Sequence, residues 1–347
     1  MRVLILPKER LSEFVKRLSR YGIVYLPLNR EVNYTFASWD EFPEPPSQEY
    51  LLSLFKDYHR TTLPPKIFFH PPQQVMFHFT DQGYKAKSTD TGKRRILFGV
   101  HPCDIHGMQI LDVIFTRQFP DPYYINRRKN SAIIGISCLP DDNCFCQSMN
   151  AEFAESGYDL FISELEKTFF VGVGTSLGED MVNDSAELFR EVSEADEDEY
   201  RDASNRKAEL YTNHVELRNM PELMETRLAK ELWEELGERC VSCGRCSMVC
   251  PTCYCYDVCD TLGFSGKDGE RERSWDSCLF REHALVAGGH NFRSARSERV
   301  KHRYAHKQSG FMEEWRRPSC VGCGRCIVAC PTHIDVLVIL NALRGKK

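Results

Sequence analysis

Short apolar runs recur along the first half of the chain with the length and composition of strands. They are rich in β-branched and aromatic residues and are bounded by polar or turn-forming residues. The clearest are RVLILP (2–7), RRILFGV (94–100), SAIIGIS (131–137) and TFFVGVG (168–174). We therefore expect residues 1 to about 190 to form a mixed α/β unit.

Between the second and third runs, the apolar residues change to a helical spacing. Ile105, Met108, Leu111 and Phe115 are three or four residues apart. Asp104 stands where the N-cap of this helix belongs. A strand–helix–strand unit is right-handed and its strands are parallel, so both strands should end at the same edge of the sheet.

The second half of the chain has a different pattern. The stretch EADEDEY (194–200) is dense in charge and poor in apolar residues, which indicates a domain boundary. The segment METRLAKELWEELGERC then predicts a helix, and the last third shows few strand signals. We expect an α+β protein, with an N-terminal α/β domain over 1–205 and a helical ferredoxin-like domain over 226–347.

The composition and net charge of the chain exclude some classes of function. The chain has 347 residues, 42% of them hydrophobic and 27% charged, with a net charge of −5, which is typical of a soluble globular protein and argues against nucleic-acid binding. No apolar run is long enough to span a membrane, and the start is too short in apolar residues for a signal peptide. We therefore expect a cytoplasmic protein without membrane insertion, in which the sixteen cysteines are metal ligands instead of disulfides.

Two copies of one cysteine motif carry the strongest chemical signal. CVSCGRCSMVCPT (240–252) and CVGCGRCIVACPT (320–332) are each the C-x2-C-x2-C-x3-C-P run of bacterial ferredoxins, whose fourth cysteine binds the other cluster. Paired CxxC knuckles also hold structural zinc, but two complete copies with the trailing Cys-Pro favour [4Fe–4S] clusters. The predicted ligands are Cys240, Cys243, Cys246 and Cys330 for cluster A, and Cys320, Cys323, Cys326 and Cys250 for cluster B.

A second group of cysteines follows the strands of the first half. Cys103 comes after the second apolar run, and Cys138, Cys144 and Cys146 come after the third. Because parallel strands of an open α/β sheet bring their carboxyl ends to one edge, where ligands bind, these four predict a further [4Fe–4S] cluster. Asp104 is a helix cap or an alternative ligand. The other interpretation is that these are buried cysteines without a metal.

The cysteines that remain form a third group. Cys253 and Cys255 form a C-x-C pair, which cannot surround a cubane cluster alone, and Cys278 is a third thiol available from a distance. We predict an additional cluster with these three ligands and a fourth from a set of alternatives, which are Cys259, Asp257, Asp260 and Asp276. The other interpretation is that these cysteines pack beside cluster B and shield it from water.

The stretch from Arg293 to Lys307 holds six lysines and arginines. It is either a solvated basic face, or a source of positive charge near a cluster that raises its potential and offers a docking patch to an acidic partner. The chain has no P-loop and no Ser/His/Asp set, so it shows no substrate chemistry of its own.

Taken together, these motifs resemble those of one known family. The segments GVHPCDIHGMQILD, GISCLPDDNCFC, CPTCYCYDVCD and RSWDSCLFREHALVAGGHNFR, followed by CVGCGRCIVACP, are similar to the iron–sulfur β subunit of cytoplasmic sulfhydrogenases and to the corresponding iron–sulfur subunit of anaerobic sulfite reductases. The resemblance runs nearly from end to end and is most specific in WDSC–AGGHNFR, which ferredoxins in general lack.

The resemblance implies a non-catalytic electron-transfer subunit. It would relay electrons through several [4Fe–4S] clusters between a flavoprotein NAD(P)H-oxidoreductase subunit and a nickel–iron hydrogenase subunit. In the alternative branch of the family the catalytic partner is a sirohaem sulfite reductase. A self-sufficient reductase with its own flavin or substrate is a third interpretation.

Overall fold

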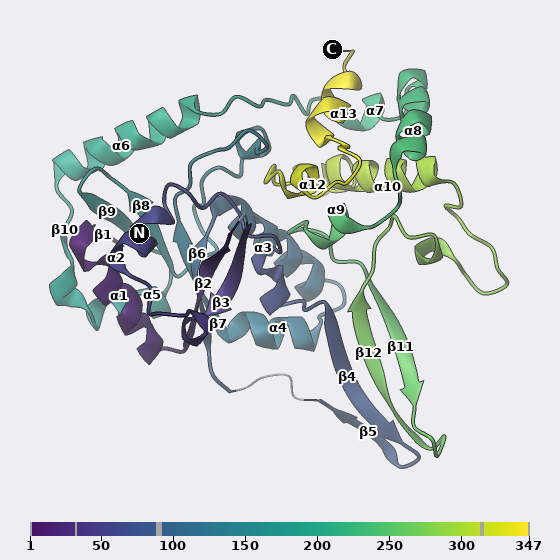
Figure 1. Ribbon diagram of the computed structural model, residues 1–347, viewed down its shortest axis with the longest axis horizontal. Coiled ribbons are helices and arrows are strands. Elements are labelled where there is room, and N and C mark those ends of the chain that lie inside the picture. Colours follow the sequence, from purple (N-terminus) through teal and green to yellow (C-terminus); the bar gives the residue numbers. More distant parts are fainter. Residues whose placement is uncertain (1, 32, 88–91, 313–315, 346–347) are drawn as a thin grey trace.

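The computed structural model of the chain describes residues 2–31, 33–87, 92–312 and 316–345 (Figure 1). An eight-stranded sheet organises the first half. In spatial order its strands are β10 (Arg190–Glu191), β1 (Arg2–Pro7), β9 (Thr168–Val173), β8 (Leu160–Glu164), β7 (Ser131–Ile136), β6 (Arg95–Val100), β2 (Ile23–Arg30) and β3 (Asn33–Ser38). The four apolar runs of the sequence are thus confirmed as strands β1, β6, β7 and β9.

The centre of this sheet is parallel and its flanks are antiparallel. β6 runs parallel to β7 and to β2, and β7 runs parallel to β8. The predicted strand–helix–strand unit is therefore confirmed, and β6 and β7 end at one edge of the sheet.

Helices cover both faces of the sheet, because the side chains of its buried central strands alternate between two cores. Ile96 and Phe98 of β6 belong to one core, and Leu97 belongs to the other. The first core is closed by α1 (Leu11–Arg17), α2 (Gln48–Ser53) and α5 (Ser176–Asn183). The second is closed by α3 (Pro102–Thr116) and α4 (Pro122–Lys129).

The charge-dense run at 194–200 is helical. It forms the first half of α6 (Glu194–Glu209), where Ser193 caps the helix and Asp196 completes a capping box. The irregular connection lies later, at residues 211–217, and leads to the helices of the second half (Figure 1). The boundary signal in the sequence therefore marked a solvent-facing helix, about ten residues ahead of the segment without regular structure.

The second half is mostly helical, as expected, but it also contains a long hairpin that the sequence did not predict. Its helices are α7 (Met220–Leu223), α8 (Arg227–Arg239), α9 (Arg245–Met248), α10 (Arg296–Gln308), α12 (Arg325–Val328) and α13 (Val336–Ala342). The hairpin consists of β11 (Tyr256–Leu262) and β12 (Asp268–Trp275).

This hairpin connects the two halves of the chain. β12 pairs with β4 (Gln73–Thr80), which in turn pairs with β5 (Gly83–Ala86), so residues from both halves form one antiparallel four-stranded sheet. The sheet projects from the body of the molecule as a narrow arm (Figure 1). Its strands were missed because β12 carries the sequence Glu-Arg-Glu-Arg at 270–273 and no apolar alternation.

No helix in the described residues is long and apolar enough to cross a membrane.

Candidate metal centres

The first repeat and the last cysteine of the second repeat line one cavity, which we call cavity A. Cys240, Cys243 and Cys246 come from the loop before α9 and from α9 itself, and Cys330 follows α12. Gly244 has a left-handed φ of 72°, which allows the sharp turn that brings the thiols together. Cavity A thus collects the four thiols that the sequence assigns to cluster A.

The second repeat builds a matching cavity, cavity B, beside the first. It is lined by Cys320, Cys323, Cys326 and Cys250, and Gly324 repeats the left-handed turn with a φ of 72°. The thiols of each set line a cavity instead of meeting at one point, and among the described residues no group of three or more His, Cys, Asp or Glu side chains is arranged to hold a single metal ion. The crossed sharing of cysteines is the pairing expected of two ferredoxin-type clusters, whose ligands stay a prediction.

Cavities A and B adjoin each other and share part of their walls. Cys326, Arg303 and Tyr304 border both of them. The two predicted cluster positions are therefore separated by no more than a layer of side chains.

The four cysteines of the first half gather at the carboxyl edge of β6 and β7. The Cys103 and Cys144 thiols lie close enough to Cys146 to raise its pKa well above the ordinary value, and Cys138 lies near enough to interact with the charges of Cys103 and Cys144. Burial raises the pKa of Cys138 to about 12, so a thiolate at this position needs a neighbouring positive charge. We call these four residues the N-terminal cysteine site.

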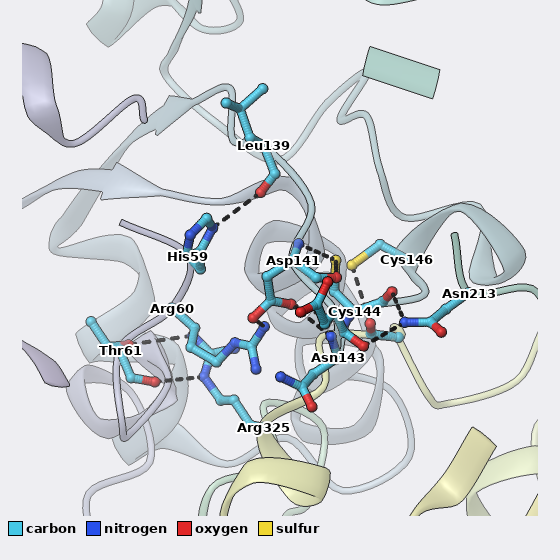
Figure 2. A network of polar contacts seen from close by, with 12 residues as sticks. His59, Arg60, Thr61, Leu139, Asp141, Asn143, Cys144, Cys146, Asn213 and Arg325 are labelled. Carbon is cyan, nitrogen blue, oxygen red and sulfur yellow. Dashed lines mark hydrogen bonds and ion pairs between the residues drawn. The ribbon is translucent and has the colours of Figure 1, made fainter. Parts of the chain in front are cut away.

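Polar contacts hold the loop that carries Cys144 and Cys146 in place (Figure 2). The Asp141 carboxylate accepts hydrogen bonds from the N–H groups of Asn143 (3.1 Å) and Cys144 (3.0 Å) and forms an ion pair with Arg60. Asn213, from the irregular segment after α6, donates to the Asp142 carbonyl (2.7 Å). Segments that are far apart in the sequence therefore fix the geometry of this site.

The N-terminal cysteine site touches the second repeat directly. The Phe145 N–H donates to the Gly322 carbonyl (2.7 Å), and the Cys146 sulfur lies 3.3 Å from the same oxygen. Cys138 faces the other way, into a separate open cavity that is also lined by Phe153, Tyr200 and Lys207. The site therefore adjoins cavity B on one side and an opening to solvent on the other.

The interpretation of Asp104 as a helix cap is wrong. His101 is the N-cap of α3 and the helix begins at Pro102, so Asp104 lies inside the first turn and is not the cap. Its carboxylate forms a bidentate ion pair with Arg325 (2.7 and 2.8 Å), and both side chains are almost fully buried. Since both carboxylate oxygens bind Arg325, which also donates to the Thr61 carbonyl (2.8 Å), Asp104 links the N-terminal cysteine site to the second repeat.

The third cysteine group is only partly assembled. Cys253, Cys255 and Cys278 all lie near the Arg303 guanidinium. The neighbouring Cys250 thiol and burial raise the pKa of Cys253, burial raises the pKa of Cys255 and Cys278, and the guanidinium opposes each increase. Asp276 is close to Cys255, because its N–H donates to the Cys255 carbonyl (3.0 Å). These contacts bring one of the four candidate fourth ligands next to the group.

The other candidates lie along β11, away from these thiols. Cys259 is exposed and its thiol donates to the Asp257 carboxylate (3.4 Å). Asp260 is paired with Arg271 (2.7 Å) on the exposed hairpin. Asp276 is therefore better placed than Cys259, Asp257 or Asp260, although its carboxylate is already bonded to His283 and to the Ser277 N–H (2.7 Å).

Buried cations without carboxylate partners surround the cysteine sets of the second half. Arg303 donates to the Cys246 carbonyl (2.8 Å) and approaches the Cys253 sulfur (3.4 Å). Lys307 donates to the carbonyl and hydroxyl of Thr252 (2.8 and 3.0 Å), and Lys66 donates to the Cys253 carbonyl (2.9 Å). In the described part of the chain, no salt bridge to a carboxylate compensates any of these three charges.

Such charges are costly to bury unless an anion lies nearby. Burial by itself lowers the pKa of Lys307, but the thiolates of Cys253 and Cys250 raise it above its ordinary value. Burial lowers the pKa of Lys66 to about 8, although Cys253 and Cys250 oppose the change. The residues present thus fit anionic, thiolate-ligated clusters, which would supply the missing negative charge.

The sequence of the basic run at 293–307 is compatible with a solvated face and with a role near a cluster. The structure shows that Arg299, Arg303 and Lys307, each one helical turn apart on α10, are buried toward the cysteines, while Arg296 stays exposed. The i, i+4, i+8 spacing was visible in the sequence, and it becomes informative once the helix is known to pack beside the repeats.

Comparisons with known proteins agree with this organisation. A family model described as a 4Fe-4S dicluster domain matches residues 239–334. Among curated proteins, the chain is 39% identical over 349 residues to the sulfhydrogenase 2 subunit beta of Pyrococcus furiosus, covering 99% of each chain. No solved structure matches the chain.

Proposed function

Because the chain belongs to the family of the sulfhydrogenase β subunits, we propose that it is an electron-transfer subunit that links a flavoprotein NAD(P)H-oxidoreductase subunit to a nickel–iron hydrogenase subunit. The observation that carries this proposal is the pair of adjoining thiol-lined cavities with buried, carboxylate-free cations around them. When bound, [4Fe–4S] clusters would supply one-electron chemistry in these cavities.

The ligands follow from the placement of the thiols. Cavity A would hold a cluster on Cys240, Cys243, Cys246 and Cys330, and cavity B one on Cys250, Cys320, Cys323 and Cys326. The N-terminal cysteine site would hold a third, on Cys103, Cys138, Cys144 and Cys146. Cys253, Cys255 and Cys278 would hold a fourth, with Asp276 as the best placed of the remaining ligands.

The protein itself keeps these sites in contact. Arg303 and Tyr304 line both cavity A and cavity B. The Phe145–Gly322 hydrogen bond (2.7 Å) and the buried Asp104–Arg325 ion pair (2.7 Å) hold the N-terminal cysteine site against cavity B. The sites therefore form a continuous series from the opening beside Cys138 to cavity A.

The first test is the metal content of the full chain, reconstituted without oxygen. We expect about sixteen irons and sixteen sulfides per chain, with one-electron reduction visible by electron paramagnetic resonance. Cys278→Ala should remove about four irons. The matched control Cys259→Ala, on the exposed strand β11, should remove none. Zinc in place of iron, or no reducible signal, would contradict the proposal.

The second test concerns the partners. The complex purified through a tag on this chain should contain flavin and nickel and should couple hydrogen oxidation to NAD(P) reduction. Removal of this chain should abolish the coupling while each partner keeps its activity with artificial dyes. Sirohaem in place of nickel would instead identify the sulfite reductase branch.

A further inference from the structure

Cavity A lies at the surface of the molecule. Cys243 is exposed, and its neighbour Val241 is 56% exposed, although both belong to the loop that lines the cavity. Arg245, on the same rim, is also exposed. A cluster in cavity A would thus be the one that a partner protein can approach along the first repeat.

A loop at residues 281–296 stands beside this rim. It exposes apolar side chains at its turn, with Leu285 at 51% and Phe292 at 66% exposure. Gly288 and Gly289 make the turn with left-handed φ values of 86° and 81°. Figure 1 shows the loop extending outward from the start of α10.

Four contacts hold the two ends of this loop against the wall of cavity A. Arg296 donates to the Cys240 carbonyl (3.2 Å). Arg299 donates to the Leu279 carbonyl (2.9 Å) and to the Ser242 hydroxyl (3.3 Å). Gly244 packs so closely on the Phe280 ring that a Cβ atom there would lie 2.6 Å from it. The loop and the first repeat are therefore parts of one surface, which we call the docking face (residues 241–245 and 281–296).

The docking face is positively charged on a protein that is negative overall. Residues 281–296 contain three arginines and one glutamate, and Arg245 adds a further positive charge, whereas the whole chain has a net charge of −5. Exposed apolar side chains within a charged rim are typical of protein–protein interfaces. The sign of the rim selects an acidic partner and disfavours a second copy of this surface.

We infer that the docking face receives an acidic redox subunit whose own cofactor lies near its surface. This inference rests on the proposed function and adds to it the place where electrons enter or leave. Leu285 and Phe292 would bury apolar area at the centre of the interface, while the arginines orient the partner so that its cofactor faces Cys243.

The test compares the full chain alone with the complex purified through a tag on it. Hydrogen exchange should slow at 241–245 and 281–296 in the complex, and not at the tip of the β11–β12 hairpin. Leu285→Ser with Phe292→Ser should release one redox subunit. The matched control, Leu262→Ser with Tyr84→Ser, removes two large side chains of the arm that are 63% and 75% exposed and should leave the complex intact.

Charge reversal gives an independent readout. Arg245→Glu with Arg281→Glu should slow association of the isolated chain with the released subunit by about tenfold or more at low salt, and the difference should shrink as salt rises. Lys85→Glu with Lys129→Glu, on β5 and α4, should not. Unchanged exchange at the docking face, equal effects of the two pairs, or protection that appears in the isolated chain as its concentration rises would overturn the inference. A chain that assembles but lacks reducible clusters would refute the proposed function instead.

Discussion

The two cysteine repeats have nearly the same sequence and the same local structure, but very different surroundings. Both begin with C-V, contain a left-handed glycine at Gly244 or Gly324, and form a four-residue helix. Yet Val241 is 56% exposed and its counterpart Val321 is 2% exposed. The motif therefore determines how the loop bends, and segments from elsewhere in the chain determine which repeat is covered.

Sequence differences between the repeats follow from these surroundings. The third residue of each motif has a positive φ, 54° at Ser242 and 67° at Gly322. A Cβ atom at Gly322 would lie 2.5 Å from the Phe145 carbonyl oxygen, so only glycine allows the N-terminal cysteine loop to pack there. Ser242 faces no such loop, and its hydroxyl instead accepts a hydrogen bond from Arg299 (3.3 Å).

Each repeat has an arginine directly before its third cysteine, Arg245 in the first and Arg325 in the second. The largest expected effect is at Arg325. Arg325→Met would leave the Asp104 carboxylate buried without its partner, which should lower the free energy of unfolding by about 3–5 kcal/mol. Arg245→Met, at the exposed position, should change it by less than about 0.5 kcal/mol. Urea denaturation of the anaerobic protein, followed by circular dichroism, measures both.

A double variant keeps this prediction testable if the single one does not fold. Asp104→Asn with Arg325→Met removes both charges and should recover part of the lost stability. Equal losses for Arg325→Met and Arg245→Met would mean that the difference in burial between the repeats has no energetic consequence.

Exchange of the third motif residue should have the next largest effect. Gly322→Ser places a side chain against the Phe145 and Cys146 backbone, and we expect a loss of about 1–3 kcal/mol from overpacking. Ser242→Gly should cost less, since it removes one hydrogen bond worth about 1 kcal/mol. The same denaturation measurement applies, and a more stable Gly322→Ser variant would contradict the packing argument.

A smaller effect is expected at Arg303, which borders both cavities. A buried positive charge favours the reduced, more negative state, so Arg303→Gln should lower the reduction potentials of both sites. At an effective dielectric constant of about 20 the loss is roughly 1–2 kcal/mol per site, which corresponds to about 40–90 mV for a one-electron couple. Potentiometric titration followed by electron paramagnetic resonance measures it, with Arg245→Gln as the exposed control. A shift at one site only would show that the guanidinium does not act on both.

The smallest effect concerns salt. Mobile ions screen exposed charges more than buried ones, so raising the ionic strength should change the potential of the site with the exposed Cys243 more than that of the covered second repeat. The same titration at about 0.05 and 0.5 M salt checks this. Equal shifts would indicate that solvent reaches both cavities alike.

Much of the fold and of the site could be predicted, because the signals were local. The strands β1, β6, β7 and β9 and the helix α3 follow from apolar periodicity, and the grouping of the thiols around cavities A and B follows from motif spacing. Since parallel strands share an edge, the meeting of Cys103 with Cys144 and Cys146 could also be derived. These predictions need only the pattern of neighbouring residues and the rule that strands joined by a helical crossover are parallel.

The rest depends on contacts between distant segments. The sequence predicts a helix cap at Asp104 because its ion-pair partner, Arg325, lies more than two hundred residues away and cannot be inferred from local sequence. The burial of Arg303 depends on the packing of α10 against the repeats. The strand β12 is polar and lies between β11 and β4 in the sheet. No apolar alternation in the sequence therefore predicts this hairpin.

The pairing of β12 with β4 also affects how the protein is made. A ribosome completes β4 at Thr80 and reaches the first residue of β12, Asp268, about 190 residues later. At roughly 5–20 residues per second this takes about 10–40 s, during which the β4–β5 hairpin has an open edge that invites pairing with other chains. Termination anywhere in that interval yields a polypeptide that keeps this edge permanently, so incomplete synthesis products should be a source of aggregation during overexpression, and a chaperone that covers extended strands should bind them in preference to the finished protein.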